Sequence, residues 1–371
     1  MAHAAIRPRQ HPPGRARDTW GSVAASAGLP LATDLRYDRV HFVPVPATNS
    51  LEGQGGIQDS TGRWLARTNG AELERRYGPT AMIHRADLLA VLCAAVPAEA
   101  LRSGVTVTEV RPDGTVAHSG GESRADLVVG ADGIHSVARR SVWPDAPAPR
   151  YAGYTAWRMI TPPVPVGESS ESWGSGERFG YVPLADGRVY CFATANAPEG
   201  ADGGGLAGLR RRFAGWHDPI PALLEATDPG AVLHDDLHEL PPLASYTKGR
   251  VALVGDAAHA MTPNLGQGAG QALEDAVVLA KTVNGPSGLD AYDRLRRPRT
   301  QKIALRSHRI GVAARWHPRR PSPCATPPCA CCPARRSSGP SARYWTGPPD
   351  RRPQPPVAVR VVAVRQWPSR G

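Results

Sequence analysis

The most constraining feature of this chain is a short apolar strand that ends in Gly-Asp and is followed by a glycine-rich turn and a helix. Residues 250–254 (RVALV) have the composition of a buried strand, and Gly255 and Asp256 follow directly. Residues 263–270 (PNLGQGAG) then bring three glycines to the start of a helix expected over 268–283, with apolar residues at helical spacing. A strand, a tight turn and a helix in this order predict the carboxyl edge of a parallel α/β sheet, where ligands bind.

The residue types at this edge also indicate what kind of ligand would bind. Gly266, Gly268 and Gly270 remove side chains from the helix start, so the backbone can closely approach a planar group. Asp256 can accept hydrogen bonds from a ribose or another polyol. The helix start favours negative charge on the ligand by roughly 0.3–1 kcal/mol, and by up to about 2 kcal/mol in a buried site.

Two further motifs are consistent with this site, although each also has a purely structural interpretation. Residues 127–133 (LVVGADG) form a second apolar strand ending in a turn with Asp132 and Gly133. Arg85 opens an amphipathic helix expected over 84–96, where it would either contact a ligand or serve as a solvated or capping residue. His259 is either structural beside the site or a general base.

Residues 151–248 interrupt this α/β pattern. They are richer in aromatic residues and predict antiparallel strands near 154–160, 179–184 and 188–193 with one helix near 206–216. Trp157, Arg158 and Tyr181 either line a substrate cavity there or belong to the core. The predicted fold class is α/β, with a Rossmann-like domain (53–150, including a hairpin near 55–70, and 249–316) interrupted by a mostly antiparallel β domain (151–248).

Together these motifs resemble those of the flavin-dependent aromatic hydroxylases, the single-component FAD monooxygenases with the para-hydroxybenzoate hydroxylase fold. Residues 255–268 are similar to the family's third FAD signature, which holds the ribityl chain and the isoalloxazine ring. Residues 130–133 are similar to the second signature, which also borders the path of NAD(P)H. Residues 84–88 (HRADL) resemble the family's short motif whose arginine contacts FAD. Residues 153–158 (GYTAWR) resemble the strand that opens the family's substrate domain. The resemblance covers about 53–316.

The resemblance implies FAD as cofactor, NAD(P)H as co-substrate, and hydroxylation of a small aromatic or similar substrate by O2 through a flavin C4a-hydroperoxide. It requires no catalytic nucleophile and no metal. The alternatives are a related FAD-dependent oxidoreductase that is not a hydroxylase, and a degenerate, non-catalytic fragment. The implied FAD-binding residues are Arg85, Asp132, Gly133, Gly255, Asp256, Pro263, Gly266, Gln267 and Gly268, and the substrate-binding candidates are Trp157, Arg158 and Tyr181.

Both ends of the chain depart from the family pattern. The family begins with a G-x-G-x-x-G unit that binds the FAD pyrophosphate, but the nearest string in the first part of this chain, residues 53–58 (GQGGIQ), leads into a predicted hairpin. Residues 1–52 do not match, and residues 317–371 are predicted to be a disordered tail rich in Pro and Arg. The composition of both ends suggests the hypothesis that they are translated out of frame.

Charge and cysteine patterns exclude several other classes of protein. The formal net charge of +11 lies in the ends, because residues 317–371 hold ten Arg and one acid, and residues 1–18 four Arg and one acid. Residues 19–316 are therefore at −1, which argues against a nucleic-acid surface. No apolar run reaches the roughly 18 residues of a membrane span, and no signal peptide is visible, so a cytoplasmic location is expected. The four cysteines within 324–332 and the histidines of 234–238 match no metal-site spacing.

Overall fold

The computed structural model describes residues 49–50, 54–70, 72, 75, 81–82, 85–184, 186–285, 287–315 and 361–364, which fall into two compact units. In the smaller unit, β1 (Asn49–Ser50) pairs antiparallel with β4 (Ala81–Met82). The predicted helix near 84–96 is α3 (Arg85–Ala94), followed by the 3-10 turn η1 (Ala98–Ala100). The elements below belong to the larger unit.

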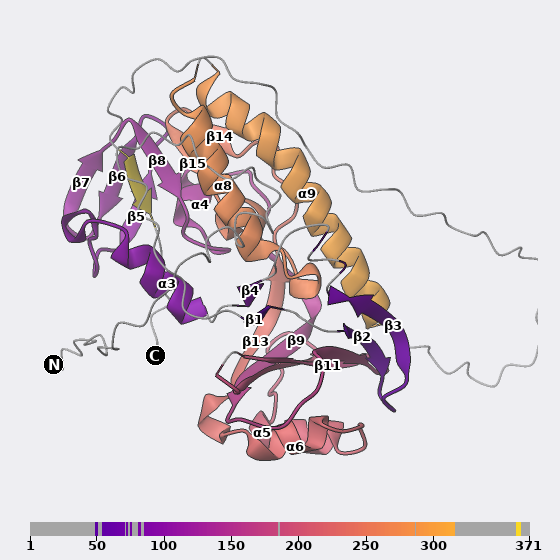
Figure 1. Cartoon of the computed structure of the whole chain (residues 1–371). Coiled ribbons are helices and arrows are strands. Elements are labelled where there is room, and N and C mark those ends of the chain that lie inside the picture. Colours follow the sequence, from indigo (N-terminus) through magenta and orange to yellow (C-terminus); the bar gives the residue numbers. More distant parts are fainter. Residues whose placement is uncertain are drawn as a thin grey trace, which may run out of the picture. The chain divides into compact units, whose positions relative to one another are not determined.

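The interrupting segment supplies five strands of a seven-stranded sheet in the order β13-β9-β12-β11-β10-β2-β3, antiparallel except between β10 and β2 (Figure 1). Helices α5 (Gly205–Phe213) and α6 (Ile220–Ala226) pack their apolar residues on one face of it. The mostly antiparallel β architecture predicted here is confirmed. The strands are β2 (Gln54–Asp59), β3 (Trp64–Asn69), β9 (Arg150–Thr161), β10 (Ser170–Trp173), β11 (Glu177–Pro183), β12 (Val189–Asn196) and β13 (Leu233–Glu239).

The hairpin predicted near 55–70 is formed by β2 and β3, but it belongs to a different sheet from the one expected. The sequence interpretation placed it in the Rossmann-like part, whereas β2 pairs in parallel with β10, in register from Gly56 opposite Ser170 to Asp59 opposite Trp173. β2 therefore satisfies backbone groups that β10 would otherwise expose as an edge strand. Local turn residues predict a hairpin, but they contain no information about which distant strand it will join.

The α/β part is built on a second sheet in the order β14-β15-β8-β16, in which β15, β8 and β16 run parallel (Figure 1). An antiparallel three-stranded sheet β5-β6-β7 accompanies it, and the buried residues of this region form their own hydrophobic core. The strands are β5 (Val107–Val110), β6 (Thr115–His118), β7 (Gly121–Arg124), β8 (Leu127–Gly130), β14 (Thr247–Lys248), β15 (Val251–Leu253) and β16 (Val361–Val364).

Strand β16 lies within the segment expected to be a disordered tail. Residues Val361–Val364 pair in parallel with Leu127–Gly130 of β8. An apolar four-residue run can complete the ladder of a buried parallel strand even where the surrounding composition is rich in Pro and Arg. The rest of 317–371 and residues 1–48 lie outside the described residues, as do the cysteines at 324–332.

The helices of the α/β part follow the strand ends. They are α4 (Val137–Val142), α7 (Asp256–His259), the 3-10 turn η3 (Pro263–Leu265), α8 (Gly268–Thr282) and α9 (Gly288–Ala314). Helix α9 runs from the α/β part to the seven-stranded sheet (Figure 1): Tyr292 donates to Leu253 O at the end of β15, and Arg315, directly after α9, donates to Ala152 O of β9.

The buried face of α8 differs from the apolar stripe that its sequence suggested. That stripe comprised Ala269, Leu273, Ala276, Val277, Ala280 and Val283, of which Ala269 and Ala276 are exposed. The buried positions instead include Gln271, Glu274 and Asp275, which face Arg296 of α9. Hydrophobic spacing mispredicts this helix because its buried polar side chains are paired across the helix interface.

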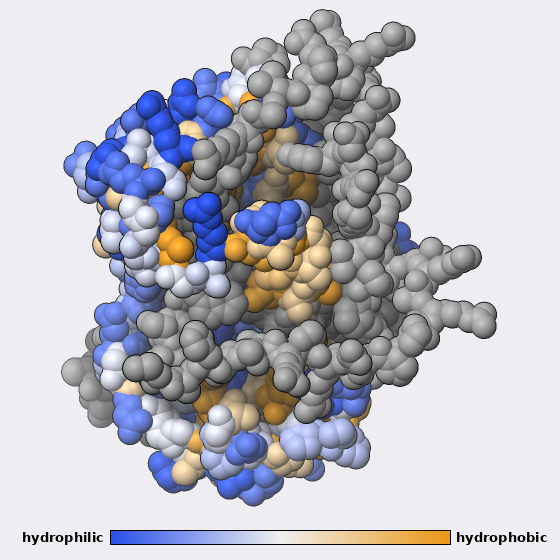
Figure 2. All heavy atoms as spheres, turned by 90° about the vertical axis from the view of Figure 1, so that its left-hand side faces the viewer, coloured by the Kyte–Doolittle hydropathy of each residue, from blue (hydrophilic) through white to orange (hydrophobic). Residues whose placement is uncertain are grey.

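Within the described ranges, no helix is long and apolar enough to cross a bilayer. Figure 2 shows both hydrophilic and hydrophobic side chains on the face that it presents.

Candidate functional site

Two strand ends that the sequence singled out lie side by side. Parallel pairing sets Val128 opposite Val251 and Gly130 opposite Leu253, and Val254 N donates to Gly130 O at 3.0 Å. The loops that follow β8 and β15 therefore leave the same edge of the sheet, where helix N-termini and loops converge. The structure thus brings together the regions of Asp132 and Asp256, as their sequence context suggested.

Gly255 makes the turn after β15. Its φ is +57° and its ψ is −139°, a conformation that side chains rarely adopt. A Cβ here would lie 3.1 Å from the Cβ of Ala272 on α8, so the helix packs directly against the strand end. Asp256 follows as the first residue of α7, and its side chain is exposed. The turn therefore presents a carboxylate at the edge of the sheet.

The start of α8 leaves open space beside this turn. Pro263 opens η3, Gly266 ends it with φ +63°, and α8 begins at Gly268 with Gln267 immediately before it. Nothing lies within 4 Å of the Cβ positions at Gly266, Gly268 and Gly270. Bare backbone with free space in front of it fits a flat ring, and the free N–H groups of the helix start favour negative charge there.

Asp132 is engaged in capping α4. Its carboxylate accepts hydrogen bonds from the Ser136 hydroxyl (2.5 Å), Val137 N (2.6 Å) and Ala138 N (3.0 Å), and it is almost fully buried. It therefore shapes the loop after β8. Gly133, at φ +77°, leaves the space at its Cβ position free. Their predicted FAD contacts stay predictions.

Arg139 links the two loops. Its buried guanidinium donates to Ala257 O at 2.8 Å in the turn after β15 and to Ile134 O in the loop after β8. Burial lowers the pKa of Arg139, and the charge of Asp132 opposes that shift. The sequence analysis missed this residue because its role depends on two carbonyl groups distant in sequence.

The predicted substrate residues lie on opposite faces of the seven-stranded sheet. Trp157 and Tyr181 are buried in the core against α5 and α6. Arg158 lies on the other face, where it forms an exposed ion pair with Asp235. Neighbouring residues of one strand point to opposite faces, so Trp157 and Arg158 were not both able to line one cavity. The placement of Trp157 and Tyr181 gives no support to their predicted substrate contacts.

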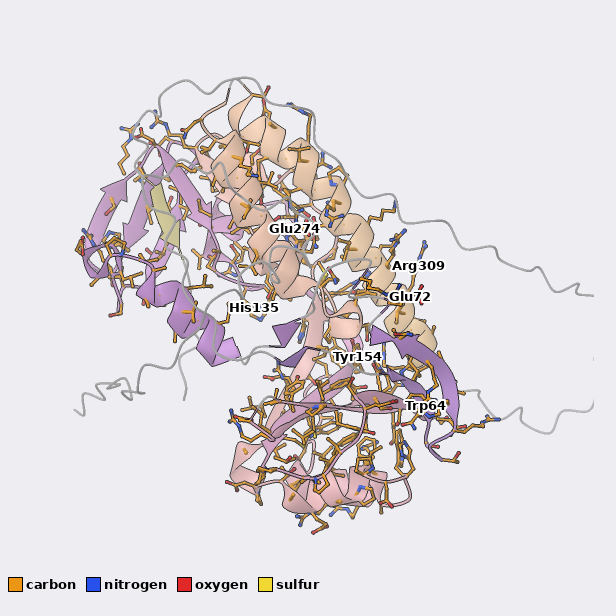
Figure 3. All side chains as sticks on the ribbon, in the orientation of Figure 1. Trp64, Glu72, His135, Tyr154, Glu274 and Arg309 are labelled. Carbon is orange, nitrogen blue, oxygen red and sulfur yellow. The ribbon has the colours of Figure 1, made fainter. Side chains whose placement is uncertain are left out.

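The face that carries Arg158 borders the loop at Pro263. Arg178 of β11 donates to Asn264 Oδ1 at 2.5 Å, and Asn264 Nδ2 lies 3.3 Å from the hydroxyl of Tyr154 on β9 (Tyr154 is labelled in Figure 3). Arg178 also pairs with Glu171 of β10. Asn264 therefore joins the glycine-rich loop to this face of the sheet. Strand alternation from Arg158 would have identified Tyr154 as a neighbour, but no local signal pointed to Asn264.

An aromatic surface lies on the same face. Tyr190 and Phe192 of β12 are half-buried, with ring centroids 6.4 Å apart, and Phe192 is opposite Arg158 in the ladder. Gly180 makes room for Phe192, since a Cβ there would lie 2.2 Å from the Phe192 ring. This surface was also missed in the sequence, although alternation along β12 places Tyr190 and Phe192 on one face and small apolar residues on the other.

The remaining candidates are Arg85, the histidines and carboxylates considered as metal ligands, and His259. Arg85 begins α3 in the smaller unit, and its predicted contact with FAD stays a prediction. Among the described residues no group of three or more His, Cys, Asp or Glu is placed to hold a metal ion. His259 is buried, and its Nε2 lies 2.6 Å from Asp275 Oδ2.

Comparisons with known proteins give the same assignment as this geometry. Residues 242–307 match the family model of an FAD binding domain. The chain is 43% identical to aurachin C monooxygenase/isomerase from Stigmatella aurantiaca over 285 residues, 73% of this chain and 74% of that protein. It is 36% identical to 2-heptyl-3-hydroxy-4(1H)-quinolone synthase from Pseudomonas aeruginosa (strain UCBPP-PA14) over 318 residues, 80% and 79% of the two chains.

Solved structures agree. The crystal structure of Klebsiella pneumoniae HpxO with FAD and uric acid matches with a TM-score of 0.68 at 30% identity, covering 73% of this chain and 74% of that one. A salicylate hydroxylase substrate complex matches with a TM-score of 0.60 at 25% identity, covering 70% and 72%.

The fold is that of the flavin-dependent monooxygenases. The chain belongs to the FAD-dependent aromatic hydroxylase family, as the sequence motifs predicted, and FAD is its cofactor. The open backbone at Gly266 and Gly268 and the exposed carboxylate of Asp256 fit a flavin ring and its ribityl chain.

Proposed function

We propose that this chain is an NAD(P)H- and O2-dependent monooxygenase that hydroxylates a small aromatic or heteroaromatic ring bound between the start of α8 and the Tyr190–Phe192 face. One observation carries the proposal. Asn264, next to Pro263 of the flavin loop, hydrogen-bonds Arg178 of the sheet, so the loop and the sheet face border the same space. The names of the relatives, which include a quinolone synthase and a urate hydroxylase, support a planar heterocycle.

The residues of the chain would share the work of binding and orientation. Asp256 would accept hydrogen bonds from the ribityl hydroxyls, and Gly266 and Gly268 would let the ring approach the backbone at the start of α8. Phe192 and Tyr190 would pack against the substrate ring and exclude water, which would otherwise divert the activated oxygen. FAD, when bound, supplies the transfer of electrons from NAD(P)H that activates O2.

The proposed reaction consumes a ring C–H, O2, NAD(P)H and a proton, and yields the ring C–OH, water and NAD(P)⁺. The test is to load the purified full chain with FAD and to supply 18O2 with 4-quinolones, urate, salicylate or 3-amino-4-hydroxybenzoate. Substrate-stimulated NAD(P)H oxidation with one labelled oxygen in the product supports the proposal.

Two other results would reject it. Oxidation of NAD(P)H without oxygen in any organic product would assign the chain to the related oxidoreductases that are not hydroxylases. A colourless protein after incubation with excess FAD would identify a non-catalytic chain. The cytoplasmic location expected from the sequence stays part of this proposal.

A further inference from the structure

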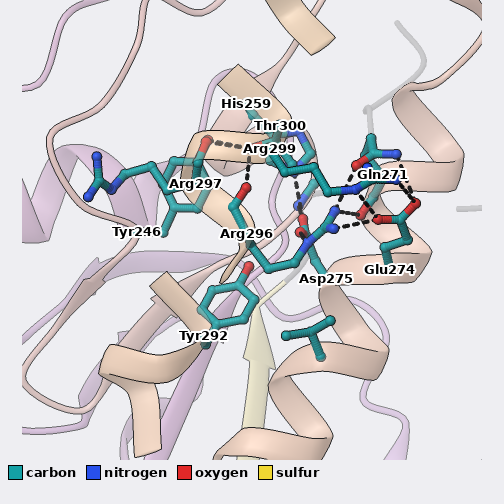
Figure 4. Close-up of polar contacts among 12 residues, drawn as sticks. Tyr246, His259, Gln271, Glu274, Asp275, Tyr292, Arg296, Arg297, Arg299 and Thr300 are labelled. Carbon is teal, nitrogen blue, oxygen red and sulfur yellow. Dashed lines mark hydrogen bonds and ion pairs between the residues drawn. The ribbon is translucent and has the colours of Figure 1, made fainter. Parts of the chain in front are cut away.

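A buried cluster of charged side chains connects α8 and α9 and reaches the turn after β15 at Gly255 (Figure 4). At its centre is Asp275, which is fully buried. Its Oδ2 accepts hydrogen bonds from Gly255 N (2.9 Å) and His259 Nε2 (2.6 Å), and its Oδ1 accepts one from Arg296 Nε (2.7 Å). The carboxylate thus reaches from the helix interface to the turn that ends β15.

This arrangement is costly unless every charge has a partner. Taking a carboxylate out of water costs several kcal/mol, and a buried ion pair often contributes little net stability compared with apolar packing. Here the guanidinium of Arg296 makes four hydrogen bonds: besides the one to Asp275, it donates to Glu274 and to both the backbone and side-chain oxygens of Gln271. Since stability alone does not require such a cluster, its contact with the turn suggests a second role.

At the end of β15, the carboxylate of Asp275 takes the place of a sheet carbonyl as hydrogen-bond acceptor for the backbone. Leu253 N donates to Tyr246 O and Val254 N to Gly130 O, both in the neighbouring strand region. Gly255 N, the next donor along the chain, donates to Asp275 of α8 instead. His259 is tied to the same turn twice, because its backbone N donates to Gly255 O at 2.9 Å while its ring binds Asp275.

We propose that Asp275 is a positioning residue for flavin binding: by holding Gly255 N and the ring of His259 together, it fixes the turn in the conformation that presents Asp256 to the ribityl chain. This inference rests on the proposed function, in which Asp256 binds the ribityl chain of the flavin. Asp275 itself would not touch the cofactor. Its substitution should therefore loosen the turn and weaken the binding of the ribityl part.

The test compares D275N with D293N in the full chain. Asp293 is a matched control, because it also accepts a backbone N–H (Tyr246 N, 2.7 Å) and pairs with an arginine of α9 (Arg297), but it does not contact the turn. Two quantities are measured: riboflavin affinity by quenching of flavin fluorescence, and amide hydrogen exchange over residues 253–260 without flavin. For D275N we expect at least about tenfold weaker riboflavin binding and faster exchange of this segment, and for D293N both within about twofold of wild type.

Other outcomes overturn the inference. If D275N keeps the riboflavin affinity and the hydrogen exchange of the wild type, Asp275 has no positioning role. If D293N loses as much riboflavin affinity as D275N and its residues 253–260 exchange as fast, the effect is one of general stability. If D275N does not fold, D275E, which keeps the charge opposite Arg296 but shifts the carboxylate, is measured in the same way. Unfolding of both variants beside a folded D293N would assign Asp275 to stability alone. If wild type binds no flavin, the proposed function fails, and the exchange measurement still decides whether Asp275 fixes the turn.

Discussion

At the scale of single residues, Gly255 is held by two separate constraints. Its positive φ is strained for any side chain, and a Cβ would meet Ala272 at 3.1 Å. We expect Gly255→Ala to lower the free energy of unfolding by about 1–3 kcal/mol, measured by urea denaturation of the apo chain. An unchanged urea midpoint would show that the turn relaxes without cost.

Gly268 should behave in the opposite way. It begins α8 with helical geometry and open space at its Cβ position, so Gly268→Ala adds a residue that favours the helix. Stability should stay unchanged or rise by up to about 1 kcal/mol, while flavin affinity falls because the methyl group occupies the space proposed for the ring. Flavin titration together with thermal unfolding measures both quantities. Unchanged affinity would place the ring elsewhere.

The two faces of the substrate sheet predict separable effects of substitution. Phe192 is half-buried on the face beside Asn264, whereas Trp157 is in the core on the other face. Phe192→Ala should raise KM for an aromatic substrate by about tenfold, equivalent to about 1.4 kcal/mol, with a small change in stability. Trp157→Phe should leave KM unchanged but lower the melting temperature, since it removes buried contacts. The reverse pattern would restore the substrate contact first predicted for Trp157.

At the scale of elements, the α8–α9 interface should be sensitive to acid. Burial acts to raise the pKa values of Glu274 and Asp275, but hydrogen bonds and positive charge from Arg299, His259 and Arg296 outweigh it, so both lie below their ordinary values of 4.5 and 3.8. Groups with a lowered folded pKa stabilise the fold above their unfolded pKa and lose that contribution as pH falls through the folded pKa. The free energy of unfolding should therefore decrease as the pH is lowered below about 4.5.

Arg296→Gln isolates this contribution. Without the guanidinium, Asp275 loses its arginine partner and Glu274 keeps only the ion pair with Arg299, so we expect the free energy of unfolding to fall by about 3–5 kcal/mol at pH 7. Protonation of the carboxylates relieves this penalty, so the gap between wild type and variant should narrow between pH 5 and 3 in parallel urea titrations. A gap independent of pH would mean that Arg296 acts by packing rather than by charge.

These elements also show what the sequence was able to predict. A strand, Gly-Asp and a glycine-rich helix start are contiguous, so local patterns predicted β15, the Gly255 turn and α8 close to their observed bounds. The buried face of α8 was mispredicted because its partner, Arg296, lies on another helix. Apart from Arg158, the sheet face opposite α5 and α6 was missed for a related reason: Asn264 and Arg178 meet only through tertiary folding. The hydrophobic periodicity of a sequence predicts which apolar side chains are buried, but it does not predict which polar side chains are buried as pairs.

At the scale of the whole molecule, the proposed flavin site has two portions: one for the ribityl chain and the ring, and one for the pyrophosphate and adenosine. In the proposed site, Asp256 and the start of α8 hold the ribityl chain and the ring. The G-x-G-x-x-G string of the printed sequence, residues 203–208 (GGGLAG), opens α5 beside the seven-stranded sheet, so it does not follow a strand of the α/β part as a pyrophosphate site requires. FAD and FMN share the ribityl chain and the ring, and differ in the adenosine half. If the first portion supplies most of the binding energy in this chain, the adenosine half should add little.

We therefore expect the Kd values of the full chain for FAD and FMN to agree within about threefold, which is below 1 kcal/mol, in parallel fluorescence titrations. Gly268→Ala should weaken both by the same factor, because it acts on the shared ring. Binding of FAD more than about tenfold tighter than FMN would contradict this and require residues that hold the adenosine half. Arg85 is the first to test in that case, since its motif resembles the family's FAD-contacting arginine: Arg85→Ala should then lower the affinity for FAD and leave that for FMN unchanged.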